Sequence, residues 1–556
     1  MHVKVAPRLS SLLLAALGGL ALGAAFPPLG WWPGALVAVA LLWWALRPDH
    51  AGWNALAGLV FGCVFFLPHL WWANLATEEA PWIALSVLEA SFLALFGAAW
   101  TWVRRGITVL LRGGRVPSGA GWWAAVAFAW LFTGVEELRA QVPFGGFPWA
   151  RLAWSMVDVP LGRAAWLGSS VLVTFGVCLA GLGLAGAVRA LSVRPLTRRS
   201  AGRAAAAVAI AAAVVVGPAA LPLPADPDAG TVTSGDGVPV HDAGQGTAED
   251  GVLVAGAVQG NVDDPGEGVF GFRPELFGNH ITGTHELAGD LAGQLDIVLW
   301  PEDSSGIDPR TDPGEAAALD AAAEAAGAPI LVGSQEYPET GGRYNTALLW
   351  EAGQGVTQRY AKQRPAPFGE YIPWRPVVRL LSDQVDRVTT DMLPGGEPAV
   401  MEVPAEASGG PGATVPVATV ICFEVAYDDI VRDAVGRGAQ VLVVPTNNAP
   451  FGWTSESTQQ LAMTRMQAMT TGRAAVQVST VGVSGVVAPD GTLVAATELF
   501  THDTFAARLP LRTTLTPAVL AGPWPGWIAA GGAGLLVAAG IAAGVVSRVR
   551  GRRRRT

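Results

Sequence analysis

The sequence predicts a polytopic α-helical membrane protein that carries an extracytoplasmic α/β domain. Of its 556 residues, 51% are hydrophobic and only 15% are charged, whereas soluble domains carry about a quarter charged residues. The apolar residues gather in runs long enough to cross about 30 Å of hydrocarbon as helices. Residues 251–510 instead alternate short apolar runs with helical patterns, which is typical of an α/β domain.

Eight apolar runs are expected to form membrane helices. They lie near residues 9–26, 31–47, 52–75, 82–103, 121–138, 165–190, 203–222 and 523–546. Lys4 and Arg8 precede the first run, as in a signal peptide, but further spans follow it, which favours an uncleaved helix. We therefore expect an N-terminal membrane domain of about seven helices over residues 1–222 and a C-terminal transmembrane helix over residues 520–547.

The basic residues of the loops indicate the orientation. They occupy alternate loops and the tail 548–556, and the main ones are Arg47, Arg104, Arg105, Arg112, Arg115, Arg189, Arg194, Arg198, Arg199 and Arg203. Since cytoplasmic loops are rich in Lys and Arg, both termini are expected in the cytoplasm and residues 223–522 outside. The formal charge of −9 does not indicate a nucleic acid partner, because the basic residues are expected to face the anionic inner leaflet and the acidic residues the exterior.

The extramembrane part divides in two. Residues 223–250 are rich in Pro, Gly, Asp, Ser and Thr, which predicts a disordered linker. Residues 251–515 are the expected α/β domain. Its strands are predicted over 252–259, 296–300, 330–333, 346–350, 356–361, 415–422, 440–445 and 475–480, and its helices over 315–326, 427–437 and 458–473.

One lysine points to the chemistry. The chain has 36 basic residues, yet only Lys4 and Lys362 are lysines. Lys362 follows a predicted strand, and so do Glu302 and Cys422. Catalytic groups of α/β sheets gather at the carboxyl ends of strands, so we expect these three residues to meet.

Glu, Lys and Cys together are the parts of a thiol-acylation site. Cys422 is the expected nucleophile and Glu302 the base that takes its proton. The Lys362 ammonium and the backbone N–H of Phe423 are expected to bind the oxyanion. Two carboxylates are candidates for holding that ammonium in position: Glu370 and Glu424. We expect no metal and no cofactor.

Four motifs carry a family resemblance. Trp300-Pro301-Glu302, Tyr360-Ala361-Lys362, Pro367-Phe368-Gly369-Glu370-Tyr371 and Cys422-Phe423-Glu424 resemble, in this order, the nitrilase (carbon–nitrogen hydrolase) superfamily. With the multispan membrane part, the chain is similar to the apolipoprotein N-acyltransferase family. This resemblance implies an αββα sandwich for the extracytoplasmic domain.

The resemblance also implies a two-step acyl transfer at a bacterial cytoplasmic membrane. Cys422 would take an acyl chain from a phospholipid as a thioester, and the amine of S-diacylglyceryl-cysteine in an apolipoprotein would accept it. A polyprenol-phosphate mannose synthase is a candidate partner in some bacteria. The substrate-binding residues that the resemblance suggests are Phe272, Tyr371, Trp374, Asn447 and Phe451.

The sequence departs from the family at two places, and two other functions stay open. Phe423 stands where the family often has Tyr, and Asn448 and Pro450 stand where it often has Asp and Trp. A membrane-tethered nitrilase-like amidase would pass the thioester to water and would need an open, polar pocket. A non-catalytic scaffold or transporter is the other alternative, and charged residues inside the spans, such as Glu89, would support transport.

Overall fold

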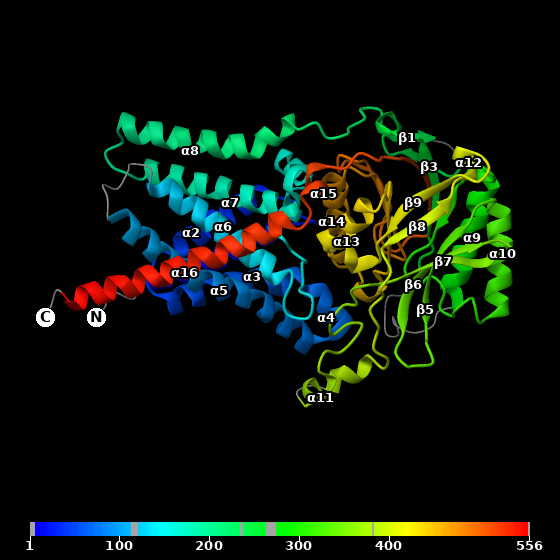
Figure 1. Cartoon of the computed structure of the whole chain (residues 1–556), viewed down its shortest axis with the longest axis horizontal. Coiled ribbons are helices and arrows are strands. Elements are labelled where there is room, and N and C mark those ends of the chain that lie inside the picture. The colour runs from blue at the N-terminus through cyan, green and yellow to red at the C-terminus, as the bar shows by residue number, and fades with distance from the viewer. Residues whose placement is uncertain (1–5, 113–119, 234–236, 263–273, 381–382, 554–556) are drawn as a thin grey trace. The chain divides into compact units, whose positions relative to one another are not determined.

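The chain folds into two compact units (Figure 1). The computed structural model describes residues 6–112, 120–233, 237–262, 274–380 and 383–553. The helical unit comprises Met1–Asn74, Glu78–Leu221 and Pro523–Thr556, and the α/β unit comprises Leu75–Thr77 and Pro222–Gly522.

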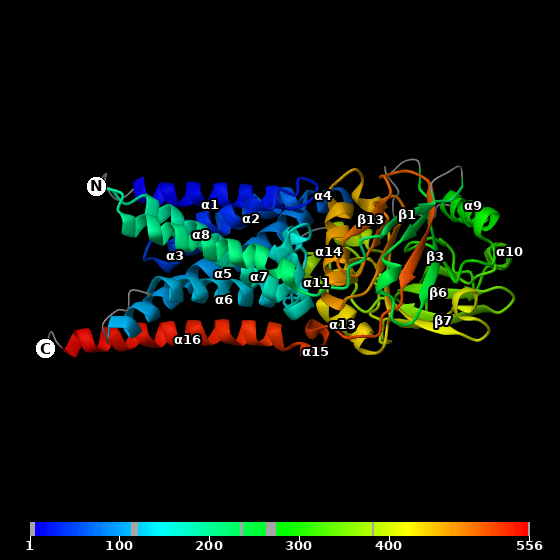
Figure 2. The same cartoon turned by 90° about the horizontal axis from the view of Figure 1, so that it is seen from above.

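The helical unit contains a helix in each of the predicted apolar runs. Its helices are α1 (Ala6–Ala25), α2 (Pro33–Ala45), α3 (Ala51–His69), α5 (Glu79–Arg112), α6 (Ala120–Arg139), α7 (Ala165–Leu191), α8 (Arg198–Val216) and α16 (Trp524–Arg553). The short helix α4 (Trp71–Thr77) begins in this unit, and its residues Leu75–Thr77 belong to the α/β unit. Among the described residues, six helices are long and apolar enough to cross a membrane: α1, α3, α5, α7, α8 and α16. Figure 2 shows the start of α1 and the end of α16 at the same end of this unit.

Three runs differ from the predicted spans. The run over 121–138 forms α6, which is not among the six helices that are long and apolar enough to cross a membrane. The run over 52–75 is wrong as one helix, because α3 ends at His69 and α4 begins at Trp71. Pro68 removes a backbone N–H in the last turn of α3, which weakens the helix there. The second run forms only the 13 residues of α2, which extend about 20 Å at 1.5 Å per residue.

Buried ion pairs hold α5, α6 and the segment between α6 and α7 together within the helical unit. Arg139 of α6 pairs with Glu89 of α5 at 2.8 Å. It also donates to the carbonyl oxygens of Phe147 and Trp149, which lie in the segment, at 2.9 and 2.8 Å. Arg151, within that segment, pairs with Glu137 of α6 at 2.6 Å. Because buried charges are stable only when paired, these contacts account for the carboxylates that the sequence places in apolar runs.

The α/β unit is an αββα sandwich, as the family resemblance implies. One sheet has the strand order β1-β2-β14-β3-β4-β5-β6-β7 and the other β13-β12-β11-β10-β9-β8. Figures 1 and 2 show α9 (Pro274–Leu291) and α10 (Pro313–Ala326) on one side of the strands, and α13 (Asp428–Gly436) and α14 (Glu456–Thr471) on the other.

The remaining elements have the following bounds. The first sheet contains β1 (Gly230–Thr233), β2 (Val240–Asp242), β3 (Val252–Gln259), β4 (Ile297–Leu299), β5 (Ile330–Glu336), β6 (Tyr344–Glu351), β7 (Gly355–Ala361) and β14 (Asp503–Pro510). The second contains β8 (Val400–Pro404), β9 (Thr414–Thr419), β10 (Val441–Thr446), β11 (Ala475–Ser479), β12 (Gly485–Val487) and β13 (Leu493–Ala496). The short helices are α11 (Arg375–Val378), α12 (Glu406–Gly409) and α15 (Pro517–Ala521).

Parallel strands form the centre of each sheet. β3, β4 and β5 are parallel neighbours in the first sheet, and β9, β10 and β11 are parallel neighbours in the second. All residues of β10 are buried, as expected for a strand that is covered on both faces. Val258, Val298 and Trp300 of the first sheet pack with Leu287 and Leu319 of its helix layer. The parallel strands therefore end together at one edge of each sheet.

The prediction of a disordered linker over residues 223–250 is wrong for its described strands. β2 pairs with β14 in parallel and with β1 in the antiparallel direction, so this segment extends the first sheet. Val240 is buried in it. The Asp and Gly residues that suggested disorder form turns instead, since the Asp242 carboxylate accepts the N–H groups of Gly244 and Gln245.

Candidate functional site

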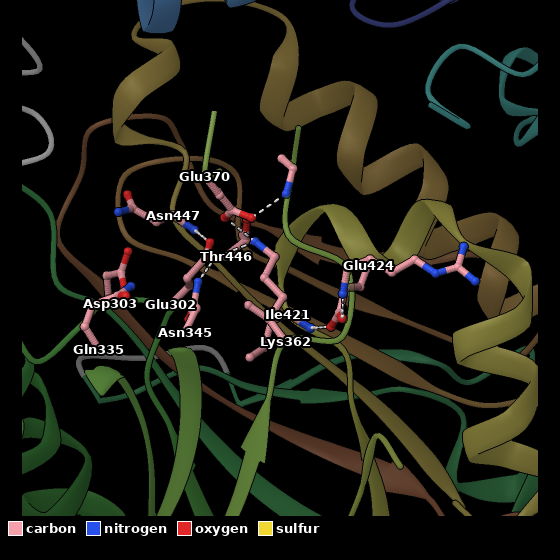
Figure 3. A network of polar contacts seen from close by, with 12 residues as sticks. Glu302, Asp303, Gln335, Asn345, Lys362, Glu370, Ile421, Glu424, Thr446 and Asn447 are labelled. Atoms are coloured by element: carbon pink, nitrogen blue, oxygen red, sulfur yellow. Dashed lines mark hydrogen bonds and ion pairs between the residues drawn. The ribbon is translucent and has the colours of Figure 1, made fainter. Parts of the chain in front are cut away.

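The three candidate residues follow strand ends, as predicted. Glu302 lies three residues after β4, Lys362 directly after β7, and Cys422 three residues after β9, at the start of the 3₁₀ helix η7 (Cys422–Ala426). Asn447 directly follows β10. Figure 3 shows Glu302, Lys362, Glu370 and Asn447 gathered in one polar network. Two strands of each sheet therefore supply this site.

Lys362 lies between two carboxylates. Its Nζ donates to Glu302 Oε1 at 3.0 Å and to Glu370 Oε1 at 2.6 Å (Figure 3), and its side chain is 1% exposed. Burial lowers the pKa of the Lys362 ammonium, but the charges of Glu302 and Glu370 outweigh burial and hold the pKa well above its usual value. Lys362 is therefore a permanent positive charge, and Glu370 contacts it as the sequence predicts.

Glu302 accepts hydrogen bonds on both carboxylate oxygens. Oε1 accepts from Asn345 Nδ2 at 2.6 Å as well as from Lys362, and Oε2 accepts from the backbone N–H of Asn447 at 2.9 Å. The chain also passes very close at this point, because a Cβ on Gly333 would lie 2.3 Å from the carbonyl oxygen of Pro301. Only glycine at position 333 allows β5 to support the Glu302 backbone in this position.

Sequence reasoning missed Asn345. This residue is buried on β6, its side chain donates to Glu302, and its carbonyl oxygen accepts the backbone N–H of Lys362 at 2.9 Å. It therefore holds both members of the ion pair. The available signal was an amide side chain inside the otherwise mostly apolar strand Tyr344–Glu351, where a buried polar group needs a partner.

Cys422 adopts an unusual backbone conformation. Its φ is +52°, in the left-handed region that residues other than Gly rarely occupy, and its side chain is half-buried. Such strained residues cluster at functional sites. Burial raises the pKa of the Cys422 thiol well above its usual value; the Glu302 charge raises it further, and the Lys362 charge lowers it. The thiol thus rests protonated and needs a base before it can attack.

Glu424 holds the backbone around Lys362 rather than the ammonium itself. Its carboxylate accepts four hydrogen bonds, from Tyr360 Oη (2.9 Å) and from the backbone N–H groups of Ile421 (3.0 Å), Gln363 (2.6 Å) and Arg364 (3.2 Å). The prediction that Glu424 contacts the Lys362 ammonium is therefore wrong in its detail. Its hydrogen bonds instead tie the start of η7 to the segment that follows β7. Burial raises the pKa of Glu424 to about 7, and the charge of Lys362 opposes this shift.

The remaining predicted residues have varied surroundings. Phe423 is buried with its ring edge-to-face against Tyr427. Tyr371 and Phe451 are half-buried, whereas Trp374 is 70% exposed. Asn447 enters the site through its backbone, because its side-chain Oδ1 accepts the N–H of Ala449 at 3.1 Å. Phe272 lies outside the described residues.

A second buried polar network adjoins this site. Asn448 Nδ2 donates to Glu456 Oε2 at 2.6 Å and to Gln460 Oε1 at 2.8 Å, and Thr446 Oγ1 donates to the same Gln460 oxygen at 3.0 Å. Glu456 is 2% exposed. Burial raises its pKa to about 8; the Glu302 charge adds to this shift, and the hydrogen bond from Asn448 opposes it. No sequence motif indicated Glu456.

Glu456→Gln is expected to remove a pH dependence of stability. The pKa of Glu456 rises from an ordinary 4.5 to about 8 in the folded protein, so folding binds a proton between these values. The stability that the protonated Glu456 contributes is fully present below pH 4.5 and is lost as the pH rises through 8. Between pH 5 and 8 the free energy of unfolding of the native chain should therefore fall by up to about 1.4 kcal/mol per pH unit relative to that of Glu456→Gln.

The measurement is thermal unfolding of both proteins from pH 5 to pH 8. Glu339→Gln, which removes an exposed carboxylate, is the control for the charge change. Parallel unfolding profiles for the native chain and Glu456→Gln would show that Glu456 is ionised in the fold.

Two family models match this chain. The family model described as "Apolipoprotein N-acyltransferase N-terminal domain" matches residues 18–183, and the model described as "Carbon-nitrogen hydrolase" matches residues 280–515. The α/β unit thus has the nitrilase-like carbon–nitrogen hydrolase fold, beside a set of apolar helices. The structure also aligns with an amidase from Nesterenkonia sp. at 16% identity and a TM-score of 0.34, over 48% of this chain and 94% of that one.

Related proteins align with nearly the whole chain. An apolipoprotein N-acyltransferase from Methylococcus capsulatus is 28% identical over 98% of this chain and 97% of its own length. One from Mycolicibacterium smegmatis is 35% identical over 93% of this chain and 83% of its own length. At that identity and coverage, the chain belongs to the apolipoprotein N-acyltransferase family.

Proposed function

We propose that this protein transfers an acyl chain from a membrane phospholipid to the N-terminal amine of S-diacylglyceryl-cysteine in apolipoproteins. The observation that carries the proposal is the buried contact of Lys362 with Glu302 and Glu370 beside a half-buried cysteine at φ +52°. This arrangement supplies a nucleophile, a base and a positively charged group that can stabilise an oxyanion. Membership of the family supports a lipoprotein as the acceptor.

In the first step the enzyme is acylated. Glu302 takes the thiol proton as Cys422 Sγ attacks the ester carbonyl carbon of the phospholipid, and the S–C bond forms. The Lys362 ammonium and the backbone N–H of Phe423 stabilise the oxyanion. The ester C–O bond then breaks, and the proton on Glu302 passes to the oxygen of the departing lysophospholipid.

In the second step the amine of the acceptor cysteine attacks the thioester carbonyl. Glu302 takes a proton from that nitrogen, the amide C–N bond forms, and the C–S bond breaks. The sulfur leaves as a thiolate and regains the proton from Glu302. Glu370 and Asn345 position Lys362 and Glu302 through both steps without touching the acyl group.

The test is mass spectrometry of lipoprotein N-termini from cells with and without the protein. Lipoproteins from the native cells should carry a third acyl chain as an amide, and those from deletion cells should end in diacylglyceryl-cysteine with a free amine. Unchanged N-termini would contradict the proposal. Release of free fatty acid without N-acylation would favour the amidase alternative.

The same proposal includes a membrane arrangement. Residues 1–222 and 520–547 span the cytoplasmic membrane, residues 251–515 form the catalytic domain outside, and the basic tail 548–556 lies in the cytoplasm. Exposed tryptophans support two interfaces, since such rings gather at the headgroup level. Those near the proposed outer ends are Trp31, Trp71, Trp524 and Trp527, and those near the inner ends are Trp122 and Trp123.

Cysteine labelling is expected to confirm this topology. In a Cys422→Ala background, Glu339→Cys should react with a membrane-impermeant maleimide in intact cells, because it is an exposed residue of the α/β unit. Arg194→Cys, exposed between α7 and α8, should react only after the cells are permeabilised. The reverse pattern would place the α/β unit in the cytoplasm and rule out the proposed reaction.

A further inference from the structure

A pocket of about 620 Å³ lies within the helical unit, among α2, α5 and α7. Its walls include Trp43 and Trp44 at the end of α2, and Trp100 of α5, whose ring is 5.4 Å from that of Trp43. Three guanidinium groups also line it: Arg47, Arg104 and Arg189. No carboxylate is among its lining residues in the described part of the chain. The pocket is thus aromatic and strongly cationic.

Arg104 has a fixed position in this pocket. Its guanidinium donates to the carbonyl oxygens of Leu46, Arg47 and Pro48 at 3.1, 2.7 and 2.9 Å. Asp49 is its nearest carboxylate at 3.6 Å, and that carboxylate also pairs with Arg105 at 2.8 Å. Arg104 therefore supports the chain after α2, and little of the negative charge of Asp49 is left to neutralise the pocket.

Arg47 and Arg189 have no such partners. Both are exposed, and within the described residues neither forms an ion pair or a side-chain hydrogen bond. Arg47 lies over the Trp44 ring at 5.7 Å, a contact that leaves N–H donors for an anion. The two positive charges also repel each other. Like charges held together without a counter-ion are stabilised by a bound anion, and guanidinium groups bind phosphate with two parallel hydrogen bonds.

We propose that this pocket binds the phosphate headgroup of an anionic phospholipid. The aromatic walls and the surrounding apolar helices suit a ligand with an apolar portion, and basic pockets between membrane helices bind such headgroups. The site lies in the helical unit, whereas Cys422 lies in the α/β unit. We therefore propose the bound lipid as a ligand of the helical unit, in addition to the acyl donor of the proposed reaction.

Native mass spectrometry of the full chain in detergent tests this site. Phosphatidylglycerol or cardiolipin should bind at least tenfold more tightly than phosphatidylcholine. The double exchange Arg47→Gln and Arg189→Gln should remove that preference. The matched control, Arg194→Gln with Arg199→Gln, removes the same charge from exposed positions outside the pocket and should keep it. Both variants should unfold at the native temperature without lipid, because the replaced groups hold no carbonyl or carboxylate.

Three results would overturn the proposal. An equal loss in the control variant would mean that the lipid responds only to overall charge. Equal binding of the anionic and zwitterionic lipids to the native chain would remove the headgroup claim. Displacement of the lipid by inorganic phosphate at comparable concentration would identify a free-anion site instead. None of these outcomes depends on Cys422, so the experiment is independent of the proposed acyl transfer.

Discussion

Cys422→Ala is expected to abolish N-acylation and to leave no acyl adduct on the protein. Loss of a catalytic nucleophile costs on the order of a million-fold in rate, which takes this activity below detection. Incubation of the native chain with phospholipid should add one fatty-acyl mass to Cys422. Neutral hydroxylamine should remove that mass, as it does for thioesters. Intact-mass and peptide measurements before and after hydroxylamine provide the readout.

Two further variants sharpen this test. Cys422→Ser should form an oxygen ester slowly, because the hydroxyl is a weaker nucleophile in the same place. Cys63→Ala, which changes a cysteine of α3 in the helical unit, should form the adduct at the native rate. An acyl group found on another residue during turnover would refute Cys422 as the nucleophile.

Lys362→Arg is expected to be nearly as damaging as Lys362→Ala, although it keeps the charge. The Lys362 ammonium is 1% exposed and lies within 3.0 Å of two carboxylates, so the cavity fits a compact group. The planar guanidinium is larger and presents its donors in a rigid fork. Loss of one oxyanion donor costs about 2.7–4 kcal/mol, or roughly a hundred- to a thousand-fold in rate.

The deciding measurement is the rate of acyl-enzyme formation in the two Lys362 variants. Thermal unfolding must accompany it, because removal of one partner of a buried ion pair costs about 3–5 kcal/mol of stability. Lys4→Arg replaces the other lysine of the chain and should be silent. Near-native acylation in Lys362→Arg would show that the site needs only a positive charge and that the compact shape is irrelevant.

The sequence predicts a helical part and an α/β part, and it predicts that Glu302, Lys362 and Cys422 follow strand ends, as they do in the structure. Each of these residues follows a strand, and a strand end is visible in the local alternation of apolar runs. Asn345 and Glu456 were missed because their roles depend on partners that are distant in the chain. Asn345 meets Glu302 across 43 positions, and Glu456 adjoins the site only because α14 packs on the second sheet.

The errors have a similar origin. The sequence predicts that Glu424 holds the Lys362 ammonium, but its carboxylate accepts hydrogen bonds from the backbone N–H groups of Gln363 and Arg364 instead. The Pro- and Gly-rich stretch before residue 250 looked disordered because composition does not report pairing with β14, which lies some 260 residues later in the chain. Local patterns predict elements, whereas tertiary contacts decide which side chains meet.

The two oxygens of Glu302 are bound from different sheets. Oε1 accepts from Lys362 and Asn345 of the first sheet, and Oε2 accepts from the backbone that follows β10 of the second. The proposed base is therefore aligned only while the two halves of the sandwich keep their mutual offset. A slip of about 1 Å between the sheets would lengthen the 2.9 Å contact of Oε2 beyond hydrogen-bond distance and leave the fold intact. On heating, catalytic activity should consequently be lost before the secondary structure melts. The activity of the enzyme therefore reports the relative position of its two sheets.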